Sequence, residues 1–539
     1  MQDYRTARDT FSIAQLAAEL LAGDLGANIN AAVECCDRWA GDPDRVAIHW
    51  IGKDFAEETV TFAALRDQSS RFANLLRARG IGKGDVVGGL LPRIPELFVV
   101  ALGAWRVGAL YQPLFTAFGP AAIESRVTAE GGSQAKLIVT DTANRPKLDG
   151  VANCPPSLVV DRGGTGTGAF AAALAAQSTV CEPVPLRGAD PFVLLFTSGT
   201  TGKPKGVLWP LNSLLNVGAY MRDGLDLRAE DRFWNVADPG WAYGMAFTMA
   251  GPLLLGHATT FHEGGFSLDG ALRILKGRGI TNLAAAPTVY RLMMAAGDAA
   301  MAPLAGQLRV ASSAGEPLNP EVARWADRVL RVPLKDQYGQ TEMLMVVANH
   351  HGLVHEVKPG AAGLPMPGFS VAVLDDALQP VPPGTSGVLA IHRPTSPMFF
   401  FAGYHQAETP AFQGPWYLTG DTMLQDADGH FLFVGRNDDV ITSSGYRIGP
   451  FDVESILMEH PAVAEVAVVG KPDPERTEIV KAFIVLRNRT NDPDALKAEL
   501  QQLVRTRLSL HAYPREIEFR DELPKTPSGK VQRFLLRQS

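Results

Sequence analysis

The most constraining feature of this sequence is a polar run that directly follows a short apolar segment. Residues 192–196 read Phe-Val-Leu-Leu-Phe, a pattern typical of a buried strand. The run combines hydroxyl residues, glycines and two lysines: Thr197, Ser198, Gly199, Thr200, Thr201, Gly202, Lys203, Pro204, Lys205 and Gly206. Glycines let backbone N–H groups converge, hydroxyls donate further hydrogen bonds, and lysines supply positive charge. We therefore predict a loop that binds phosphate groups, rather than a polar surface turn.

This loop differs from the phosphate loop of the common nucleoside triphosphatases. That motif needs four residues between its glycines and a Ser or Thr after the lysine. Here two residues separate Gly199 from Gly202, and Pro204 follows Lys203. A kinase or ATPase that cleaves the γ-phosphate is therefore disfavoured.

The order of predicted elements indicates two units. Up to about residue 435, short apolar runs alternate with helical stretches, which favours α/β layers. Strands are predicted at 85–91, 135–140 and 308–312, and a helix at 95–108. A smaller α+β unit follows, with helices at 451–460 and 493–508 and strands at 464–469, 481–486 and 516–519. We predict an α/β fold with a large, multi-layered N-terminal domain (1–436) and a small C-terminal domain (437–539).

Composition excludes several classes of protein. Of 539 residues, 46% are hydrophobic and 20% charged, as in soluble globular chains. The net charge of −7 is negative and would not attract nucleic acid, which is itself negatively charged. The four cysteines lack metal spacing and the N-terminus lacks a signal-peptide pattern, so we expect reduced thiols and a cytoplasmic location. Residues 239–260 carry no formal charge, but Pro252 and four glycines favour a buried helix with its leading loop over a membrane span.

Further motifs follow the polar run in a fixed order. They are Ser312-Ser313-Ala314-Gly315-Glu316-Pro317, Asp336-Gln337-Tyr338-Gly339-Gln340-Thr341-Glu342, Tyr417-Leu418-Thr419-Gly420-Asp421, Gly435-Arg436-Asn437-Asp438-Asp439, Ser444-Gly445-Tyr446-Arg447-Ile448 and Pro527-Ser528-Gly529-Lys530. Each motif alone fits a turn, a packed side chain or a solvated charge. In this order and spacing, over nearly the whole chain, they resemble the adenylate-forming (AMP-binding) enzymes. Residues 437–454 and 286–291 most resemble medium-chain acyl-CoA synthetases.

The resemblance implies an ATP and AMP site. It would comprise the residues from Thr197 to Lys205 together with Gly315, Glu316, Pro317, Asp336, Gln337, Tyr338, Gly339, Gln340, Thr341, Asp421, Arg436 and Arg447. Tyr338 would offer a flat face to adenine, beside Asp336 as acceptor for its amino group. Asp421 would take both ribose hydroxyls, and the arginines would bind ribose and phosphate oxygens.

The resemblance also assigns catalytic and coenzyme residues. Thr341, Glu342 and Lys530 would be catalytic, with Glu342 as the Mg²⁺ ligand. Lys530 would bridge the attacking carboxylate and the α-phosphate, and acetylation by a lysine acetyltransferase would remove its charge. Ser444, Gly445 and Tyr446 would bind coenzyme A, and Asp438 would be the hinge of a mobile C-terminal domain.

The segment around residue 241 resembles the lining of an acyl pocket. By resemblance, Trp241, Ala242, Tyr243, Gly315 and Gly339 would face the acyl chain. In acetyl-CoA synthetases a second tryptophan stands at the place of Gly339. Its absence removes a large apolar group, so we predict that acetate is a poor substrate and that a medium-chain, branched or aromatic acid is preferred.

The implied reaction is that of an AMP-forming acyl-CoA synthetase. A carboxylate and ATP give an acyl-adenylate and pyrophosphate, and coenzyme A then gives acyl-CoA and AMP. The partners are a small carboxylic acid, ATP and coenzyme A, with no nucleic acid and no membrane span; a homo-oligomer stays open. The main alternative is a free-standing ligase that loads an acyl or aryl carrier protein, since no fused carrier domain is expected after Lys530.

Three other classes of protein are disfavoured. Residues 164–169 loosely fit GxGxxA, but no second strand with an acidic end follows, so a dinucleotide-binding oxidoreductase is not supported. A non-catalytic binding protein conflicts with the presence of Glu342, Arg436 and Lys530. His350, His351 and His355 lack a zinc-site pattern, and we expect them to be exposed loop residues.

Overall fold

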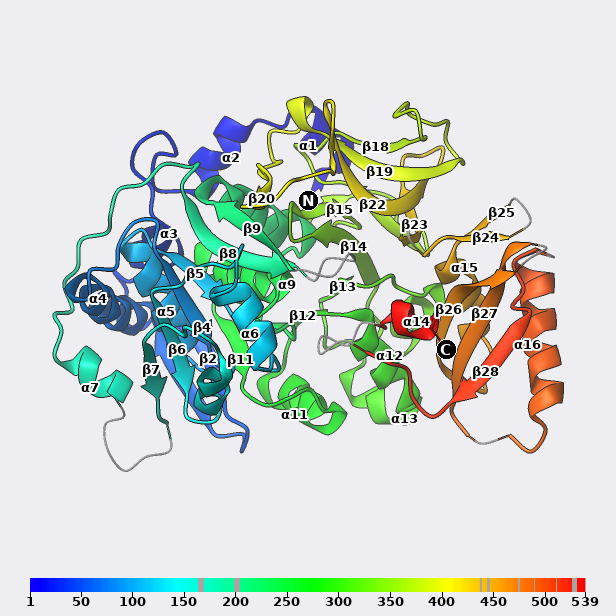
Figure 1. The fold of residues 1–539 in the computed structure, drawn as a ribbon, viewed down its shortest axis with the longest axis horizontal. Coiled ribbons are helices and arrows are strands. Elements are labelled where there is room, and N and C mark those ends of the chain that lie inside the picture. Colours follow the sequence, from blue (N-terminus) through cyan, green and yellow to red (C-terminus); the bar gives the residue numbers. More distant parts are fainter. Residues whose placement is uncertain are drawn as a thin grey trace.

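The structure, a computed structural model, describes residues 1–539 apart from 163–168, 198–203, 437–438, 444–445, 474–475, 489, 510, 526–530 and 539, and apart from the side chains of residues 442, 446 and 447. Two large sheets form the N-terminal unit and a third, smaller sheet forms the C-terminal unit. Figure 1 shows the small unit, in orange and red, at one end of the molecule.

The first sheet has seven strands in the order β20-β9-β8-β5-β4-β6-β7. Their bounds are β4 Val86–Leu90, β5 Leu110–Pro113, β6 Leu137–Asp141, β7 Ser157–Val160, β8 Pro191–Thr197, β9 Lys205–Pro210 and β20 Tyr404–His405. Helices α4 (Phe62–Ala78) and α5 (Glu96–Arg106) pack together beside it. Every residue of α5 after Glu96 is buried, in keeping with its nearly uncharged sequence.

The second sheet has fourteen strands and contains most of the sequence motifs. Its path runs through β18 Val371–Leu374, β19 Ser386–His392, β22 Trp416–Gln425, β23 Phe431–Arg436, β17 Ala361–Pro365, β15 Leu344–Ala348, β14 Leu334–Gln340, β13 Val310–Ala314, β12 Asn282–Ala285, β10 Phe233–Asn235, β11 Thr259–His262, β2 Val46–Ile51 and β3 Glu57–Thr61, with β21 Phe412–Gln413 beside β22. Strands β10 to β14 pair in parallel, so their carboxyl ends share one edge. Ligands of α/β sheets bind at such an edge.

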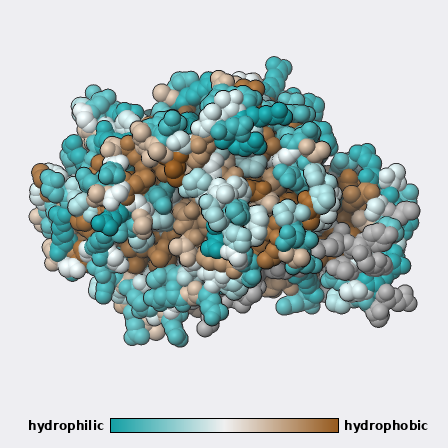
Figure 2. All heavy atoms as spheres, turned by 90° about the horizontal axis from the view of Figure 1, so that it is seen from above, coloured by the Kyte–Doolittle hydropathy of each residue, from teal (hydrophilic) through white to brown (hydrophobic). Residues whose placement is uncertain are grey.

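The uncharged stretch at 239–260 is a buried helical segment, as predicted. It consists of α9 (Ala242–Gly244), a π-helical turn (η5, Met245–Ala250) and α10 (Gly251–Leu254), buried from Gly244 to Leu254. Within the described part of the chain, no helix is both long and apolar enough to cross a membrane. The face in Figure 2 mixes apolar with polar residues over the large unit.

The small unit has a five-stranded sheet in the order β25-β24-β27-β26, with β28 also beside β27. Its elements are β24 Ile441–Ser443, β25 Tyr446–Ile448, α15 Pro450–Met458, β26 Val463–Asp473, β27 Thr477–Leu486, α16 Pro493–Arg507 and β28 Glu516–Arg520. The helices and strands predicted for this region are confirmed. Asp492 caps α16 by accepting from the backbone of Ala495 at 3.0 Å.

The small unit docks on the large one through helices α14 (Pro320–Trp325) and α15. The side-chain amide of Asn319 donates to the hydroxyl of Ser455 at 3.1 Å, and Arg324 lies 3.4 Å from Glu459. The side chain of Asn319 is 4% exposed. These contacts join α14 and its N-cap, which follow the motif at residues 312–317, to the first helix of the small unit.

The expectation that the histidine cluster is exposed is wrong: two of its members are buried and His355 is half-buried. His350 and His351 are buried, and His350 stacks on Tyr4 with ring centroids 5.4 Å apart. Tyr4 follows β1 (Gln2–Asp3), which pairs with β16 (Leu353–Val354) and so covers the histidines. Burial lowers the pKa of His350 to about 3, so that this ring is neutral at physiological pH.

Candidate functional site

The first part of the site lies where β8 and β9 meet. These strands form an antiparallel pair that brings Thr197 opposite Lys205, on either side of the predicted phosphate loop. Strand β20 pairs with β9, and this places the ammonium of Lys205 at 4.9 Å from the ring centroid of Tyr404. Ser198, Gly199, Thr200, Thr201, Gly202 and Lys203 lie outside the described residues.

The second part of the site is a hydrogen-bond network around Asp421. Its Oδ2 accepts from the hydroxyl of Tyr338 at 2.5 Å and from Nε2 of Gln340 at 2.7 Å. Gln340 is held by the Tyr417 hydroxyl, which donates to its Oε1 at 3.0 Å, and Arg436 lies 3.6 Å from Oδ1 of Asp421. The structure therefore brings together Tyr338, Asp421 and Arg436, which three separate motifs contribute.

Asp336 occupies a half-buried position in the first half of β14, opposite Ser313 of β13. Its Oδ2 accepts from the backbone N–H of Leu318 at 3.3 Å. Among the described residues, no group donates a hydrogen bond to its buried Oδ1. Burial raises the pKa of Asp336 to about 7. A buried acceptor without a donor fits a ligand that brings its own N–H, as the adenine amino group would.

Glu342 is the candidate metal ligand of this site. Its side chain is 8% exposed, and Oε1 accepts from the Tyr404 hydroxyl at 2.9 Å. Burial raises the pKa of Glu342, while the Tyr404 hydroxyl and the positive charge of Arg436 act in the opposite direction. Among the described residues, no group of three His, Cys, Asp or Glu side chains forms a metal site. One carboxylate suits Mg²⁺, which typically takes one or two carboxylates together with the phosphates of a substrate.

Gly339 has a structural reason to be glycine. A Cβ at this position would lie 2.1 Å from the carbonyl oxygen of Leu344, because the turn from β14 into β15 brings the two backbones together. The absence of a side chain at 339 therefore follows from this turn, whatever the size of the acyl group. Gly315 differs, since its φ of +91° favours glycine and its missing Cβ would face open space.

The predicted acyl-pocket residues on α9 lie among aromatic rings. The ring centroid of Trp241 lies 5.2 Å from that of Phe115 and 5.9 Å from that of Phe118. The ring of Tyr243 contacts Tyr220 and Phe247, with centroids 6.4 and 5.2 Å away. Trp241, Ala242 and Tyr243 are all half-buried, so this segment joins the core to an accessible surface.

Several predicted residues remain outside this description. Asp438, Ser444, Gly445 and Lys530 lie outside the described residues, and Tyr446 and Arg447 are described only as backbone of β25. Thr341, Glu316 and Pro317 are placed at the same sheet edge as Tyr338. Glu316 is held by Arg291 at 2.8 Å and by the Thr288 hydroxyl at 2.9 Å.

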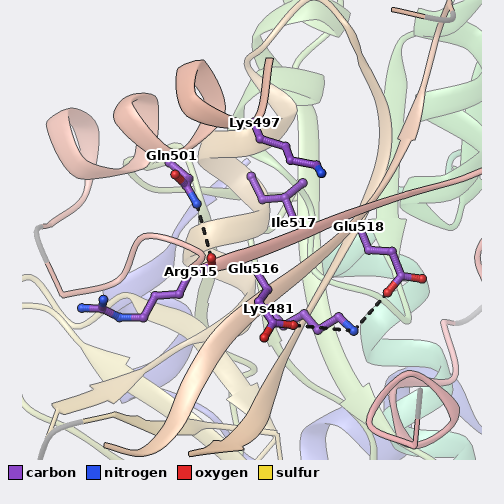
Figure 3. Close-up of a pocket in the computed structure, with 7 residues that line it drawn as sticks. All are labelled: Lys481, Lys497, Gln501, Arg515, Glu516, Ile517 and Glu518. Carbon is purple, nitrogen blue, oxygen red and sulfur yellow. Dashed lines mark hydrogen bonds and ion pairs between the residues drawn. The ribbon is translucent and has the colours of Figure 1, made fainter. Parts of the chain in front are cut away.

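A hollow of about 360 Å³ lies elsewhere, on the small unit (Figure 3). Lys481 points between Glu516 and Glu518, with its ammonium 3.0 Å from Glu518. Lys497 and Gln501 of α16, together with Arg515 and Ile517, complete the lining. The described lining contains none of the predicted site residues. The charge of Lys481 is already paired with Glu516 and Glu518 of the same lining, so we do not place the nucleotide here.

Sequence reasoning missed two tyrosines and one tryptophan. Tyr404 donates to Glu342, Tyr220 bonds Tyr243, and the indole N–H of Trp209 donates to the carbonyl of Thr341 at 2.8 Å. Each comes from a segment remote in sequence from its partner. Of these three residues, only Trp209 could have been suspected from the sequence, because it follows the predicted phosphate loop on strand β9.

Comparisons with known proteins identify the family to which the chain belongs. Residues 36–405 match the AMP-binding enzyme family, and residues 452–530 match the AMP-binding enzyme C-terminal domain. The crystal structure of Brucella canis acyl-CoA synthetase is 54% identical, with a TM-score of 0.81, and the match covers 100% of this chain and 99% of that one. Acetyl-coenzyme A synthetase of Bacillus subtilis (strain 168) is 38% identical, over 94% of this chain and 90% of the relative. Mitochondrial acyl-coenzyme A synthetase ACSM5 of Homo sapiens is 39% identical, over 92% of this chain and 86% of the relative. The chain belongs to the AMP-binding enzyme family, among relatives that are acyl-CoA synthetases.

Proposed function

We propose that this protein is an AMP-forming acyl-CoA synthetase. In the first step, a carboxylate oxygen attacks the α-phosphorus of ATP and pyrophosphate leaves, which gives an acyl-adenylate. In the second step, the thiol of coenzyme A attacks the acyl carbonyl, its proton is lost, and AMP leaves. The observation that carries the proposal is the network of Tyr338, Gln340 and Arg436 around Asp421, which suits a ribose beside a stacked adenine.

The residues of the site have distinct proposed roles. Asp336 accepts from the adenine amino group, and Arg436, Arg447, Thr341 and the loop from Thr197 to Lys205 bind ribose and phosphate oxygens. Glu342 would hold Mg²⁺, which supplies positive charge next to the phosphates. Lys530 stabilises the negative charge that develops at the α-phosphate. Ser444, Gly445 and Tyr446 line the path of coenzyme A, and the small domain (437–539) turns about Asp438 between the two steps.

The proposed acid is larger than acetate. The aromatic residues around Trp241 and Tyr243 provide apolar surface that a longer or aromatic acyl group would bury, at about 0.8 kcal/mol for each methylene group. Acetate remains the second candidate, because one relative is an acetyl-coenzyme A synthetase. A ligase that loads a separate carrier protein is the alternative for the second step.

A panel of acids tests this function. Pyrophosphate release is measured with acetate, butyrate, 2-methylbutyrate, hexanoate, octanoate and benzoate, each with and without coenzyme A. Release that requires a larger acid and turns over with coenzyme A is the expected result. Highest activity on acetate would overturn the proposed acid, and release that coenzyme A does not accelerate would favour a carrier-protein ligase. Release with none of the acids would contradict the proposed activity.

A further inference from the structure

Three polar side chains form a linear hydrogen-bond chain that ends at Tyr243, one of the predicted acyl-pocket residues. They are Gln337 of β14, Tyr220 of the π-helical turn η4 (Tyr220–Gly224), and Tyr243 of α9. Gln337 and Tyr220 are 2% and 0% exposed, and Tyr243 is half-buried at the end of the chain. The neighbouring rings are apolar: Phe247 lies 4.4 Å from Tyr220 and 5.2 Å from Tyr243, between ring centroids.

The direction of each hydrogen bond follows from the fixed end of this chain. Nε2 of Gln337 donates to the carbonyl oxygen of Gly224 at 3.1 Å, which orients the amide. Oε1 of Gln337 must then accept, and the Tyr220 hydroxyl donates to it. Because a tyrosine hydroxyl has one proton, Tyr220 has none left for Tyr243.

The orientation of Tyr243 is therefore determined. The two tyrosine hydroxyl oxygens lie 3.0 Å apart, and Tyr243 has to donate its proton to Tyr220. Its oxygen keeps a lone pair to which no described residue donates a hydrogen bond. At this point the site can accept a hydrogen bond, and neither tyrosine can donate one.

We propose that Tyr243 makes the enzyme select carboxylic acids that carry a hydrogen-bond donor, such as an amino group, on the acyl part, and reject acids that carry only an acceptor there. This inference rests on the proposed function, and it names the class of acid that the same site takes. A donor group completes the last hydrogen bond of the chain. An acceptor such as an ether oxygen or a second carboxylate would face the Tyr243 lone pair with no proton between them.

Pairs of acids with equal shape test the proposal. On the acid skeleton that gives the highest turnover in the panel, one hydrogen-bearing position at a time receives a hydroxyl or a methyl group, and a methoxy or an ethyl group; the hydroxyl is an uncharged donor on any of these skeletons. The ratio of kcat/KM within each pair isolates the hydrogen bond from the size of the group. We expect kcat/KM for the hydroxyl acid to exceed that for the methyl acid by about 3- to 10-fold at the position that reaches Tyr243, as one neutral hydrogen bond provides. We expect methoxy to fall below ethyl by a similar factor.

Two variants separate the roles of the tyrosines. Tyr243→Phe should bring both ratios close to one. Tyr220→Phe leaves the Tyr243 hydroxyl without its acceptor, so its proton can turn to the substrate, and methoxy should rise to or above ethyl. Tyr290→Phe is the matched control, because this buried tyrosine donates only to backbone carbonyls, that of Ser312 at 3.0 Å among them. Its ratios should equal those of the native protein.

The outcomes distinguish the inference from the function on which it rests. Turnover of the unsubstituted acid with ratios near one in the native protein would overturn the role of Tyr243 and leave the synthetase activity intact. Equal ratios in the native protein and in Tyr220→Phe would overturn the proton arrangement. Pyrophosphate release with none of the acids would overturn the proposed function itself.

Discussion

The hydroxyl of Tyr338 donates a hydrogen bond of 2.5 Å to Oδ2 of Asp421, and so joins two strands that lie 83 residues apart in the sequence. The same oxygen accepts from Gln340. Asp421 itself is only 4% exposed, so a ligand that reaches it must enter a preorganised polar site.

Replacing the carboxylate of Asp421 should weaken nucleotide binding. Asp421→Asn removes the negative charge that Tyr338, Gln340 and Arg436 contact in the native protein. Hydrogen bonds to charged groups contribute about 1.5–3 kcal/mol, so we expect the KM for ATP to rise about 10- to 150-fold in ATP–pyrophosphate exchange. Asp376→Asn, at an exposed turn, is the control and should leave the KM unchanged. A change of less than twofold in Asp421→Asn would refute the role of this residue.

Glu342 and Tyr404 should differ in their effect on the requirement for Mg²⁺. Glu342→Gln removes the carboxylate that would bind the ion, and we expect the Mg²⁺ concentration for half-maximal rate to rise about 10-fold or more. Tyr404→Phe keeps the carboxylate and removes one hydrogen bond to it, so the Mg²⁺ concentration for half-maximal rate should rise only a few-fold. Titration of pyrophosphate release with MgCl₂ measures both. Equal shifts in the two variants would argue against Glu342 as the metal ligand.

Asp336 should make stability depend on pH. Burial raises its pKa to about 7 in the folded protein, above the ordinary value of 3.8, so folding favours the protonated form. Its stabilising contribution is complete below about pH 4 and is lost as the pH rises to 7. Asp336→Asn stays neutral. We therefore expect the free energy of unfolding of Asp336→Asn, relative to that of the native protein, to rise by about 1 kcal/mol per pH unit between pH 5 and 7. Above pH 7 this difference should become constant.

Urea unfolding at half-unit steps of pH measures this difference. Asp376→Asn again serves as the control: its free energy of unfolding should differ from that of the native protein by the same amount at every pH. A gap between native protein and Asp336→Asn that stays constant from pH 5 to 8 would show that the carboxyl group of Asp336 titrates normally.

Gly339→Ala should destabilise the fold. Its Cβ would lie 2.1 Å from the carbonyl oxygen of Leu344, so the backbone has to move, at a cost of about 1–3 kcal/mol. Gly277→Ala, in the helix α11 (Leu268–Arg278), meets nothing within 4 Å and should be neutral or stabilising. Chemical unfolding compares the two. Native-like stability in Gly339→Ala would mean that the turn tolerates a side chain, which would restore the link between this glycine and the acyl pocket.

Lys530 should act in the first step of the reaction. In Lys530→Ala we expect pyrophosphate release to fall about 100-fold or more, the scale of a lost electrostatic group in a transition state. Formation of acyl-CoA from a supplied acyl-adenylate should stay within a few-fold of the native rate. Lys497→Ala is the control, because this lysine lies on α16 and forms an ion pair with Asp494 of the same helix. Equal loss in both steps would assign Lys530 a structural role instead.

The sequence by itself determined the α/β architecture, with a large N-terminal and a small C-terminal unit, and it predicted candidate residues for a nucleotide site. Strands such as β8 and helices such as α5 and α16 follow from local patterns, because apolar periodicity and capping act over a few residues. The motifs containing Tyr338, Asp421 and Arg436 were recognised by their order and spacing, through the resemblance to AMP-binding enzymes.

Only the tertiary structure decided how these residues meet. The pairing of β20 with β9 brings Tyr404 to Glu342, and the chain from Gln337 through Tyr220 directs the proton of Tyr243. Gly339 was interpreted as space for an acyl group, yet the backbone of Leu344 accounts for it. His350 was expected in solvent, yet Tyr4 and β1 cover it. Each case depends on contacts between segments far apart in sequence, and a local pattern carries no information about which segment will lie opposite.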